Sequence, residues 1–503
     1  MSTSCQGFTS LLNGLCQQVP ELSGSSVYAA SKQSVGGFDL LLTSSGRAKR
    51  LWAVAPNASA LPDELEGTAY SSPSVAAKCC PLTHANALAL REMLPWTAPR
   101  SLRNERTTFG CGDRLGRATP GHLQAVSRYN VSPVLAQQSI RELTLTGRTF
   151  EGVVDDVTFL VFQAGFTGGF GADGDHLKTL DDINTAVDAG MAMITLDLSE
   201  VMLAAAEKWS AQDVEEAFGQ LPADVQQRIS ETYAGKTFAV ESASVSLDDI
   251  EAKRCAVMYL EAMDFAGDVH DLLLKRRGDA FDLEISIDET EAPTLPGHHL
   301  FIIRELLYRN ITVSSLAPRF IGEFQKAIDY IGDLEEFERQ FAIHCAIAKA
   351  HGDYKVSIHS GSDKFSAYPI IGKHTNHRVH VKTAGTSWLE AIRAVAEASP
   401  ALYRELHNKA LASFEDALRY YHVTPDLNAV PELSSVPDDQ LTAFMEHDGA
   451  RQLVHVTYGG ILSDAPLAER FFATLDEHED VYYACLLKHF NRHLDALGLT
   501  PTA

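Results

Sequence analysis

Short apolar runs alternate with amphipathic stretches between residues 106 and 400. The runs have the length and the β-branched content of strands, and most of the stretches between them carry apolar residues at helix spacing. This alternation indicates βα units and a parallel sheet. The runs that we interpret as strands are Thr108–Cys111, Pro133–Gln137, Gly171–Asp175, Met193–Leu198, Phe281–Ile287, Ile311–Ser315, Tyr354–His359 and Arg378–Lys382.

Eight such units in roughly 300 residues predict a TIM (β/α)8 barrel, an α/β fold. Amphipathic stretches follow most of the predicted strands. The helices expected around the barrel are Pro120–Tyr129, Phe150–Phe162, Leu180–Ala189, His299–Tyr308, Ile321–Ala350 and Ser387–Ala398.

Three regions fall outside this regular alternation. Residues 1–105 mix Ser, Gly and Pro with short apolar runs, which predicts an N-terminal α/β addition rich in strands. Residues 199–280 are too long for one connection and predict a mainly helical insertion after the fourth strand. Residues 401–503 predict a helical C-terminal extension, in which Leu453–Tyr458 could also form a strand. Residues 106–400, with the insertion, would form the catalytic domain.

Composition excludes several classes of partner. A net charge of −24 and a pI near 5.2 argue against nucleic acid, which requires clustered Lys and Arg. No apolar run approaches the roughly 20 residues of a membrane helix. Residues 1–20 contain no Lys or Arg, which argues against a secretory signal and predicts a cytoplasmic protein. A homo-oligomer is compatible with the sequence.

The cysteines are expected to be reduced thiols. No two of them form a CxxC pair, and the adjacent Cys79 and Cys80 are poorly placed for an ordinary disulfide. The remaining cysteines are Cys5, Cys16, Cys111, Cys255, Cys345 and Cys485.

Ionisable residues gather at the predicted C-terminal ends of the strands, where TIM barrels carry their active sites. A barrel selected for stability alone has little use for so many charges there, so their density favours a catalytic protein. They are Asp113 and Arg114 at the first strand, Asp175 and His176 at the third, Glu284, Ser286 and Asp288 at the fifth, His359 and Ser360 at the seventh, and His380 and Lys382 at the eighth.

Five motifs around these strand ends resemble those of bacterial tagaturonate epimerases, which interconvert tagaturonate and fructuronate. The resemblance extends from Phe109 to Tyr421. It implies an isomerase of hexuronate metabolism with a small sugar acid as its partner. The motifs are Phe109–Gly116, Gly174–Thr179, Phe281–Glu289, Ser314–Phe320 and Ile358–Phe365.

Histidines on different strands that converge at one barrel mouth are typical of a divalent metal site, for which Zn, Mn, Co and Ni are equally suitable. His176 and His359 are the predicted ligands. His380 is a third candidate, although it could lie one layer below the mouth.

Asp175 and Glu284 are the residues that we expect to transfer protons. Asp175 precedes His176 directly, so on a regular strand the two would point to opposite faces unless the strand is ending there. Glu284 lies in an alternating run whose even positions would face the barrel interior. The alternative for Glu284 is an ion pair with a neighbouring Lys or Arg.

The carboxylate of a sugar acid requires cations or oriented amides. Lys382 and Thr383 lie between the eighth strand and the next helix, a frequent anion site in barrels, although Gly-Thr-Ser before a helix is also an ordinary N-cap. The other residues expected to contact substrate are Asp113, Arg114, Lys178 and Arg319, and Lys364 adds a further positive charge.

The two hexuronates differ at a carbon whose C–H is not acidified by the ketone. One route removes the proton of that carbon's hydroxyl, breaks the adjacent C–C bond and closes it on the other face of the resulting aldehyde. Direct deprotonation and reprotonation at carbon is the second route. The neutral ketohexoses fructose and tagatose are possible additional substrates. The rival functions are a metal-dependent aldolase or sugar isomerase on the same barrel, and a non-catalytic sugar-acid binding protein.

Overall fold

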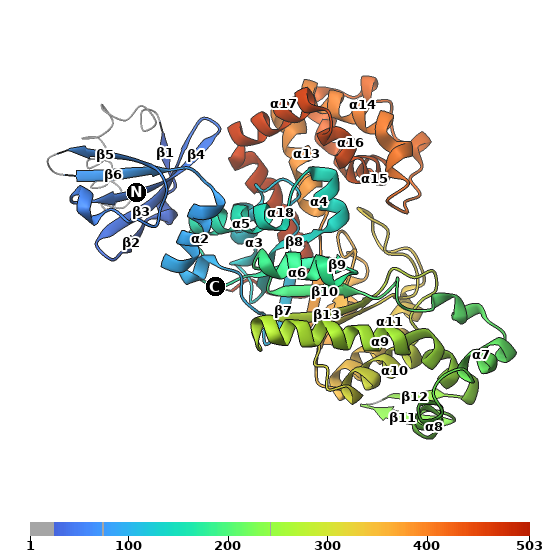
Figure 1. Ribbon diagram of the computed structural model, residues 1–503. Helices are drawn as coiled ribbons and strands as arrows, with labels where there is room; N and C mark the ends of the chain where they lie inside the picture. Colours follow the sequence, from blue (N-terminus) through green and yellow to red (C-terminus); the bar gives the residue numbers. More distant parts are fainter. Residues whose placement is uncertain (1–24, 73–74, 242, 503) are drawn as a thin grey trace.

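A closed barrel of eight parallel strands forms the centre of the computed structural model, which describes residues 25–72, 75–241 and 243–502 (Figure 1). Each strand pairs with the next along the chain, and the last pairs with the first, which confirms the TIM barrel. The strands are β7 (Thr107–Gly110), β8 (Ser132–Ser139), β9 (Gly171–Leu177), β10 (Met193–Asp197), β13 (Asp282–Ile287), β14 (Ser315–Pro318), β15 (Lys355–Ile358) and β16 (Val379–Lys382).

The sixth barrel strand is the one whose predicted position was wrong. The apolar run that begins at Ile311 precedes the strand, and β14 starts only at Ser315. Its position is set by pairing with β13, in which Glu284 lies opposite Ser315 and Ile287 lies opposite Pro318. Ile311 is buried before the strand begins, so a β-branched residue at this position reflects packing in the core and not strand pairing.

The predicted helices around the barrel are found at their expected positions except for the one after β14, and a further helix, α12, was not predicted. This helix, α11, begins at Leu334 and not at Ile321, because Asp333 caps it through the amides of Glu335 and Glu336. Residues 321–333 form a loop instead. The helices are α3 (Thr119–Val126), α5 (Phe150–Ala164), α6 (Leu180–Asp188), α10 (Pro296–Tyr308), α11 (Leu334–Ala350), α12 (Tyr368–Thr375) and α13 (Thr386–Ala398).

The insertion after β10 contains helices, as predicted, and a hairpin that the sequence did not reveal. It projects from one end of the barrel (Figure 1). The buried Glu305 of α10 holds it in place, because its carboxylate accepts hydrogen bonds from Arg228 and Tyr233 of the insertion. The elements are η5 (Ala204–Lys208), α7 (Ala211–Phe218), α8 (Ala223–Thr232), β11 (Lys236–Val240), β12 (Ala243–Leu247) and the long helix α9 (Asp249–Arg277).

The N-terminal addition is an antiparallel sheet of order β1-β3-β4-β6-β5, with β2 paired to β3. Its apolar face packs with α2 (His84–Met93) against Phe159 and Phe162 of α5. The strands are β1 (Ser26–Val27), β2 (Gln33–Val35), β3 (Phe38–Ser45), β4 (Ala48–Ala55), β5 (Thr68–Ser72) and β6 (Val75–Cys80).

The C-terminal extension is helical and lies against the barrel on the side of α3 and α13 (Figure 1). The alternative strand at Leu453–Tyr458 is wrong, because these residues end one helix and begin the next. The helices are α14 (Pro400–Ala417), α15 (Asp448–Val456), α16 (Tyr458–Leu462), α17 (Ala465–Glu477) and α18 (Glu479–Ala496), and α4 (Ile140–Thr146) packs against α16.

Two predictions from composition can be compared with the described part of the chain. None of its helices is long and apolar enough to cross a membrane. Cys80, Cys111, Cys255, Cys345 and Cys485 are free thiols there, as expected. Cys5, Cys16 and residues 1–20, on which the prediction about secretion rests, lie outside the described residues.

Candidate active site

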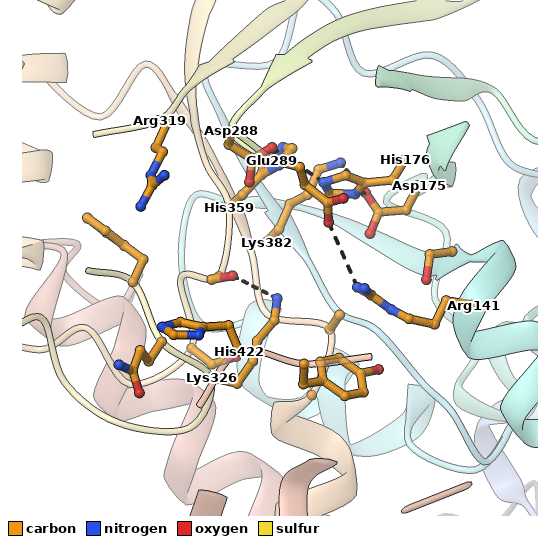
Figure 2. A pocket seen from close by; sticks show the side chains of 18 of the residues that line it. Arg141, Asp175, His176, Asp288, Glu289, Arg319, Lys326, His359, Lys382 and His422 are labelled. Carbon is orange, nitrogen blue, oxygen red and sulfur yellow. Dashed lines mark hydrogen bonds and ion pairs between the residues drawn. The ribbon is translucent and has the colours of Figure 1, made fainter. Parts of the chain in front are cut away.

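A cavity of about 810 Å³ opens at the C-terminal ends of the barrel strands. Figure 2 shows Asp175, His176, Asp288, His359 and Lys382 grouped on one side of it, with Lys326 and His422 across the cavity and Arg141 and Arg319 at its flanks. The cavity is therefore acidic and imidazole-rich on one wall, and basic on the others.

An irregularity in β9 brings Asp175 and His176 to the same wall. His176 has a φ of +54°, and the pairing of β9 with β10 shifts register between Gly174 and Leu177. This bulge lets neighbouring side chains turn together, so Oδ1 of Asp175 lies 2.9 Å from Nδ1 of His176. A non-glycine residue in the left-handed region costs about 1–3 kcal/mol, which is common at functional sites. The expected conflict between adjacent residues is resolved by this bulge, because β9 continues past them to Leu177.

His176, His359 and Asp288 converge at the mouth. Their donor atoms all lie within 4.8 Å of one another. Oδ1 of Asp288 is 3.0 Å from Nδ1 of His359 and 3.4 Å from Nε2 of His176. The two imidazole rings are 4.8 Å apart between centroids. Two imidazoles and a carboxylate that face an open cavity form a donor set suitable for a divalent first-row metal ion.

Lys382 lies at the floor of the cavity among three carboxylates. Its Nζ is 2.8 Å from Asp173, 2.7 Å from Asp175 and 2.8 Å from Glu284, and it also donates to Thr195. The lysine side chain is only 3% exposed. Its ammonium is therefore enclosed by the protein, and the alternative of an ion pair for Glu284 is what the structure shows.

The charges of this buried cluster do not balance. Burial raises the pKa of Asp173 to about 6. The charges of Asp175 and Glu284 raise this pKa further, while the ammonium of Lys382 lowers it. Burial also opposes ionisation of Glu284, but Lys382 and then His359 hold the pKa of that carboxyl well below its usual value.

Asp175 and Asp288 are held ionised in the same way. Burial opposes this at both residues, but Lys382 and His176 keep the pKa of Asp175 low, and His359 and His176 keep that of Asp288 low. Lys382 therefore serves three carboxylates, whereas Asp288 lies against His176 and His359, which supply positive charge there only when protonated. A divalent ion between the imidazoles and Asp288 would supply the missing charge.

His380 is not brought into this group. It is fully buried, with Nδ1 2.9 Å from the hydroxyl of Thr108, and the two residues pair across β16 and β7 one layer below Lys382. Its Nε2 has no hydrogen-bond partner among the described residues. Burial lowers the pKa of His380 to about 3, so its ring is neutral in these surroundings.

Several predicted substrate contacts are engaged by the protein itself. The Asp113 carboxylate accepts the amides of Leu115, Gly116 and Ala118. The Thr383 hydroxyl donates to the carbonyl of Gly110 at 2.7 Å. The guanidinium of Arg114 forms a buried ion pair with Glu142 at 2.7 Å, and Lys178 lies 3.3 Å from Glu200 and 3.6 Å from Asp197.

The cations that face the cavity were only partly foreseen. Arg319 lines it, as expected, and donates to the carbonyl of Thr290. Lys326 also lines it, and its Nζ lies 2.7 Å from Ser360 Oγ. Within the described part of the chain, no carboxylate lies in ion-pair distance of either cation. Lys364, in contrast, donates to three backbone carbonyls.

Lys326 and Asp288 are the functional candidates that sequence analysis missed. Asp288 was recognised as a strand-end residue without a role, although the alternation that directs Glu284 inward also places Asp288 on that face. Lys326 lies in the loop that was predicted as helix, so the sequence carried no signal for it.

The chain matches the tagaturonate epimerase family over residues 28–497. The tagaturonate/fructuronate epimerase of Thermotoga maritima is 41% identical over 418 residues, which cover 83% of this chain and 86% of that one. The one-glycerol complex of the fructuronate-tagaturonate epimerase UxaE from Cohnella laeviribosi has a TM-score of 0.91 and 42% identity, and covers 99% of this chain and 100% of that one. Its native structure has the same TM-score and 43% identity, over 97% and 100%.

The barrel, its polar cavity and these matches define an enzyme of the isomerase class, an epimerase that acts on carbohydrates or their derivatives. The chain belongs to the tagaturonate epimerase family.

Replacing Lys382 with Met removes the counter-charge of three buried carboxylates. We expect the free energy of unfolding to fall by about 3–5 kcal/mol, the usual cost of removing one partner of a buried ion pair. The loss should be smaller at about pH 5.5 than at about pH 8, because a carboxylate left without Lys382 has a raised pKa in the folded state, which favours folding as the pH falls. Urea unfolding at the two pH values measures both effects.

Lys382→Met combined with Asp173→Asn should recover part of the lost stability, because one of the repelling charges is removed. Lys373→Met, at an exposed ion pair with Glu338, is the matched control and should change little. An unfolding midpoint of Lys382→Met equal to that of the parent protein would show that the ammonium does not hold the carboxylates together.

Proposed function

We propose that this protein interconverts D-tagaturonate and D-fructuronate with the help of a divalent metal ion. Membership of the family and the names of its relatives support the substrate. The observation that carries the chemistry is the placement of Asp175 beside His176 and His359 on one wall of the cavity, with the buried carboxylate of Glu284 directly behind it, 2.7 Å from Nε2 of His359. A binding protein has no need for paired carboxylates in that place.

His176, His359 and Asp288 are the residues that would hold the metal. A bound cation is supported by the mixture of nitrogen and oxygen donors in this group, and by Lys382, whose ammonium is already surrounded by three other carboxylates. When bound, a divalent ion of the Zn, Mn, Co or Ni class supplies Lewis acidity, which stabilises negative charge on a sugar oxygen.

Asp175 and Glu284 are the proposed proton carriers. Contact with the Lys382 ammonium keeps both carboxyls ionised. Asp175 lines the cavity and can accept the proton of a substrate hydroxyl directly, whereas the fully buried Glu284 would act through the side chains in front of it, Lys382 and His359. Lys382 also fixes both carboxylates at the cavity floor. Its role is to position these residues, because Asp173, Asp175 and Glu284 already surround its ammonium.

The position of the two carboxylates favours cleavage and re-formation of a C–C bond. Direct inversion at carbon requires a base on one face of the sugar and an acid on the other. Asp175 and Glu284 instead contact the same ammonium, and Glu284 is buried behind the wall that carries Asp175. In the favoured route a carboxylate takes the hydroxyl proton, the adjacent C–C bond breaks to give an aldehyde and an enediolate, and the bond closes on the opposite face of the aldehyde while the proton returns to its oxygen.

Lys326 and Arg319 are the proposed partners of the substrate carboxylate. Both line the cavity, and neither has an ion-pair partner in the described part of the chain. Arg141 also lines the cavity, but it lies 4.0 Å from Glu289 and is partly neutralised. Fructose and tagatose lack the carboxylate and would be weaker substrates of the same reaction.

An aldolase on the same barrel is the second candidate, because the favoured route passes through two fragments. Contacts with the charged residues that line the cavity would retain both fragments until the bond closes. Release of trapped three-carbon products would favour the aldolase.

The purified enzyme should convert tagaturonate into fructuronate and the reverse, as followed by chromatography. Removal of metal with a chelator should abolish conversion, and a divalent first-row ion should restore it. Asp288→Asn should lower the bound metal per chain, whereas His380→Asn should retain it, since His380 lies below the site. Full conversion by metal-free protein would refute the metal, and loss of metal in His380→Asn alone would replace Asp288 by His380 as a ligand.

Asp175→Asn and Glu284→Gln should each lower turnover by at least ~10²-fold, the usual scale for loss of a general acid or base. Single-turnover kinetics under saturating substrate separate this effect from weaker binding. Ser357→Ala, at a buried hydroxyl of β15, is a suitable control for disturbance of the barrel interior. Turnover of either carboxylate variant close to that of the parent enzyme would remove that residue from the mechanism.

Lys326→Met should raise the Michaelis constant for hexuronates about ten- to a hundredfold more than that for fructose or tagatose, as loss of a charge-assisted hydrogen bond predicts. Lys178→Met is the control, because its ammonium is paired with Asp197 and Glu200 and should leave this ratio unchanged. Equal losses on charged and neutral sugars would show that Lys326 does not bind the carboxylate.

A further inference from the structure

A second group of metal-ligating side chains lies outside the barrel mouth, where the insertion meets α10. Donor atoms of Glu251, Cys255 and His298 all lie within 4.8 Å of one another. Glu251 and Cys255 are four residues apart on α9 and therefore share one helix face, and His298 is in the first turn of α10. Cys255 and His298 are almost completely buried.

A candidate fourth donor, Glu207, lies beside His298. Oε2 of Glu207, from η5, lies 3.7 Å from Nε2 of His298 and has no hydrogen-bond partner among the described residues. Oε1 of Glu251 lies 2.5 Å from the same Nε2. Donors of a tetrahedral zinc site are about 3.3–3.8 Å apart, so small movements of these side chains would create the site.

The surroundings of His298 are those of a metal ligand. Its Nδ1 lies 3.0 Å from the hydroxyl of Tyr259, which is four residues beyond Cys255 on the same face of α9. Such a contact fixes the ring and directs Nε2 toward the other donors. Arg254 lies 3.4 Å from the second oxygen of Glu251, leaving Oε1 free to turn inward. With two carboxylates, a thiolate and one divalent ion, the remaining negative charge would be balanced by Arg254.

A cavity of about 380 Å³ reaches this group and is lined by Glu207, Tyr259 and His298. It is also lined by Glu289, Thr290 and Glu291, which border the active-site cavity as well. The loop between β13 and α10 therefore has Asp288 at one end and His298 near the other.

We propose that Cys255, His298, Glu251 and Glu207 form a second metal site, with a preference for zinc or another thiophilic divalent ion. Binding displaces the thiol proton of Cys255 and the proton shared by His298 and Glu251. The site joins η5, α9 and α10 and holds the insertion against the loop that carries Asp288. Its role is structural, because Cys255 and His298 are almost completely buried where α9 meets α10.

Cobalt(II) distinguishes the two sites, because only the second contains a thiolate. Chelated protein titrated with cobalt should bind roughly two ions per chain and develop thiolate-to-cobalt charge-transfer absorption in the near ultraviolet. Cys255→Ser should abolish this absorption and lower the stoichiometry by about one ion. His176→Ala should also lower the stoichiometry by about one but retain the absorption. Cys345→Ser, at a free cysteine of α11 outside the group, is the control for loss of a thiol.

Zinc competition in the wild-type protein gives a second measurement that needs no variant. Added zinc should displace cobalt and remove the charge-transfer band. A wild-type protein that binds cobalt without this band overturns the proposal, as does a band that survives Cys255→Ser. Both results would leave Glu251 and His298 as a buried ion pair.

Discussion

The buried ammonium of Lys382 is the interaction on which the active site depends. Three carboxylates from β9 and β13 converge on it, and without a shared cation their mutual repulsion in a desolvated barrel would separate them. Asp173 and Asp175 come from β9 and Glu284 from β13, so one side chain of β16 ties together strands on different sides of the barrel. The same contact keeps the proposed proton carriers ionised. Stability and catalysis therefore use one group of charges.

This arrangement also accounts for the different walls to which we assign the proposed metal ion and the substrate carboxylate. Lys382 balances only part of the negative charge at the floor, which leaves His176, His359 and Asp288 suited to a cation. Cations without carboxylate partners, Lys326 and Arg319, lie away from this wall (Figure 2). A sugar acid placed between them would direct its hydroxyls toward the carboxylates and its own carboxylate away from them.

Much of the barrel was predictable from sequence, because βα alternation reflects burial on both sides of a parallel sheet. The same logic predicted that the residues following each strand would meet at one edge, which placed His176 and His359 together. It failed where pairing or capping decides the structure. Ile311 has strand propensity but precedes β14, and Asp333 starts α11 late, so the loop with Lys326 was hidden. The ion-pair partners of Lys382 and Arg114 could not be predicted from the sequence either, since they come from distant parts of the chain.

The most direct test of this account is to locate the metal ion, because the account places it at the acidic wall of the cavity. X-ray diffraction from metal-loaded crystals at the absorption edge of the ion gives an anomalous peak that marks its position. The peak is expected within coordination distance of His176, His359 and Asp288, at about 2.0–2.2 Å from nitrogen and oxygen, with Lys382 still among its carboxylates. A peak beside His380, or crystals of active enzyme with no peak at the barrel mouth, would contradict the assignment of the acidic wall as a metal site.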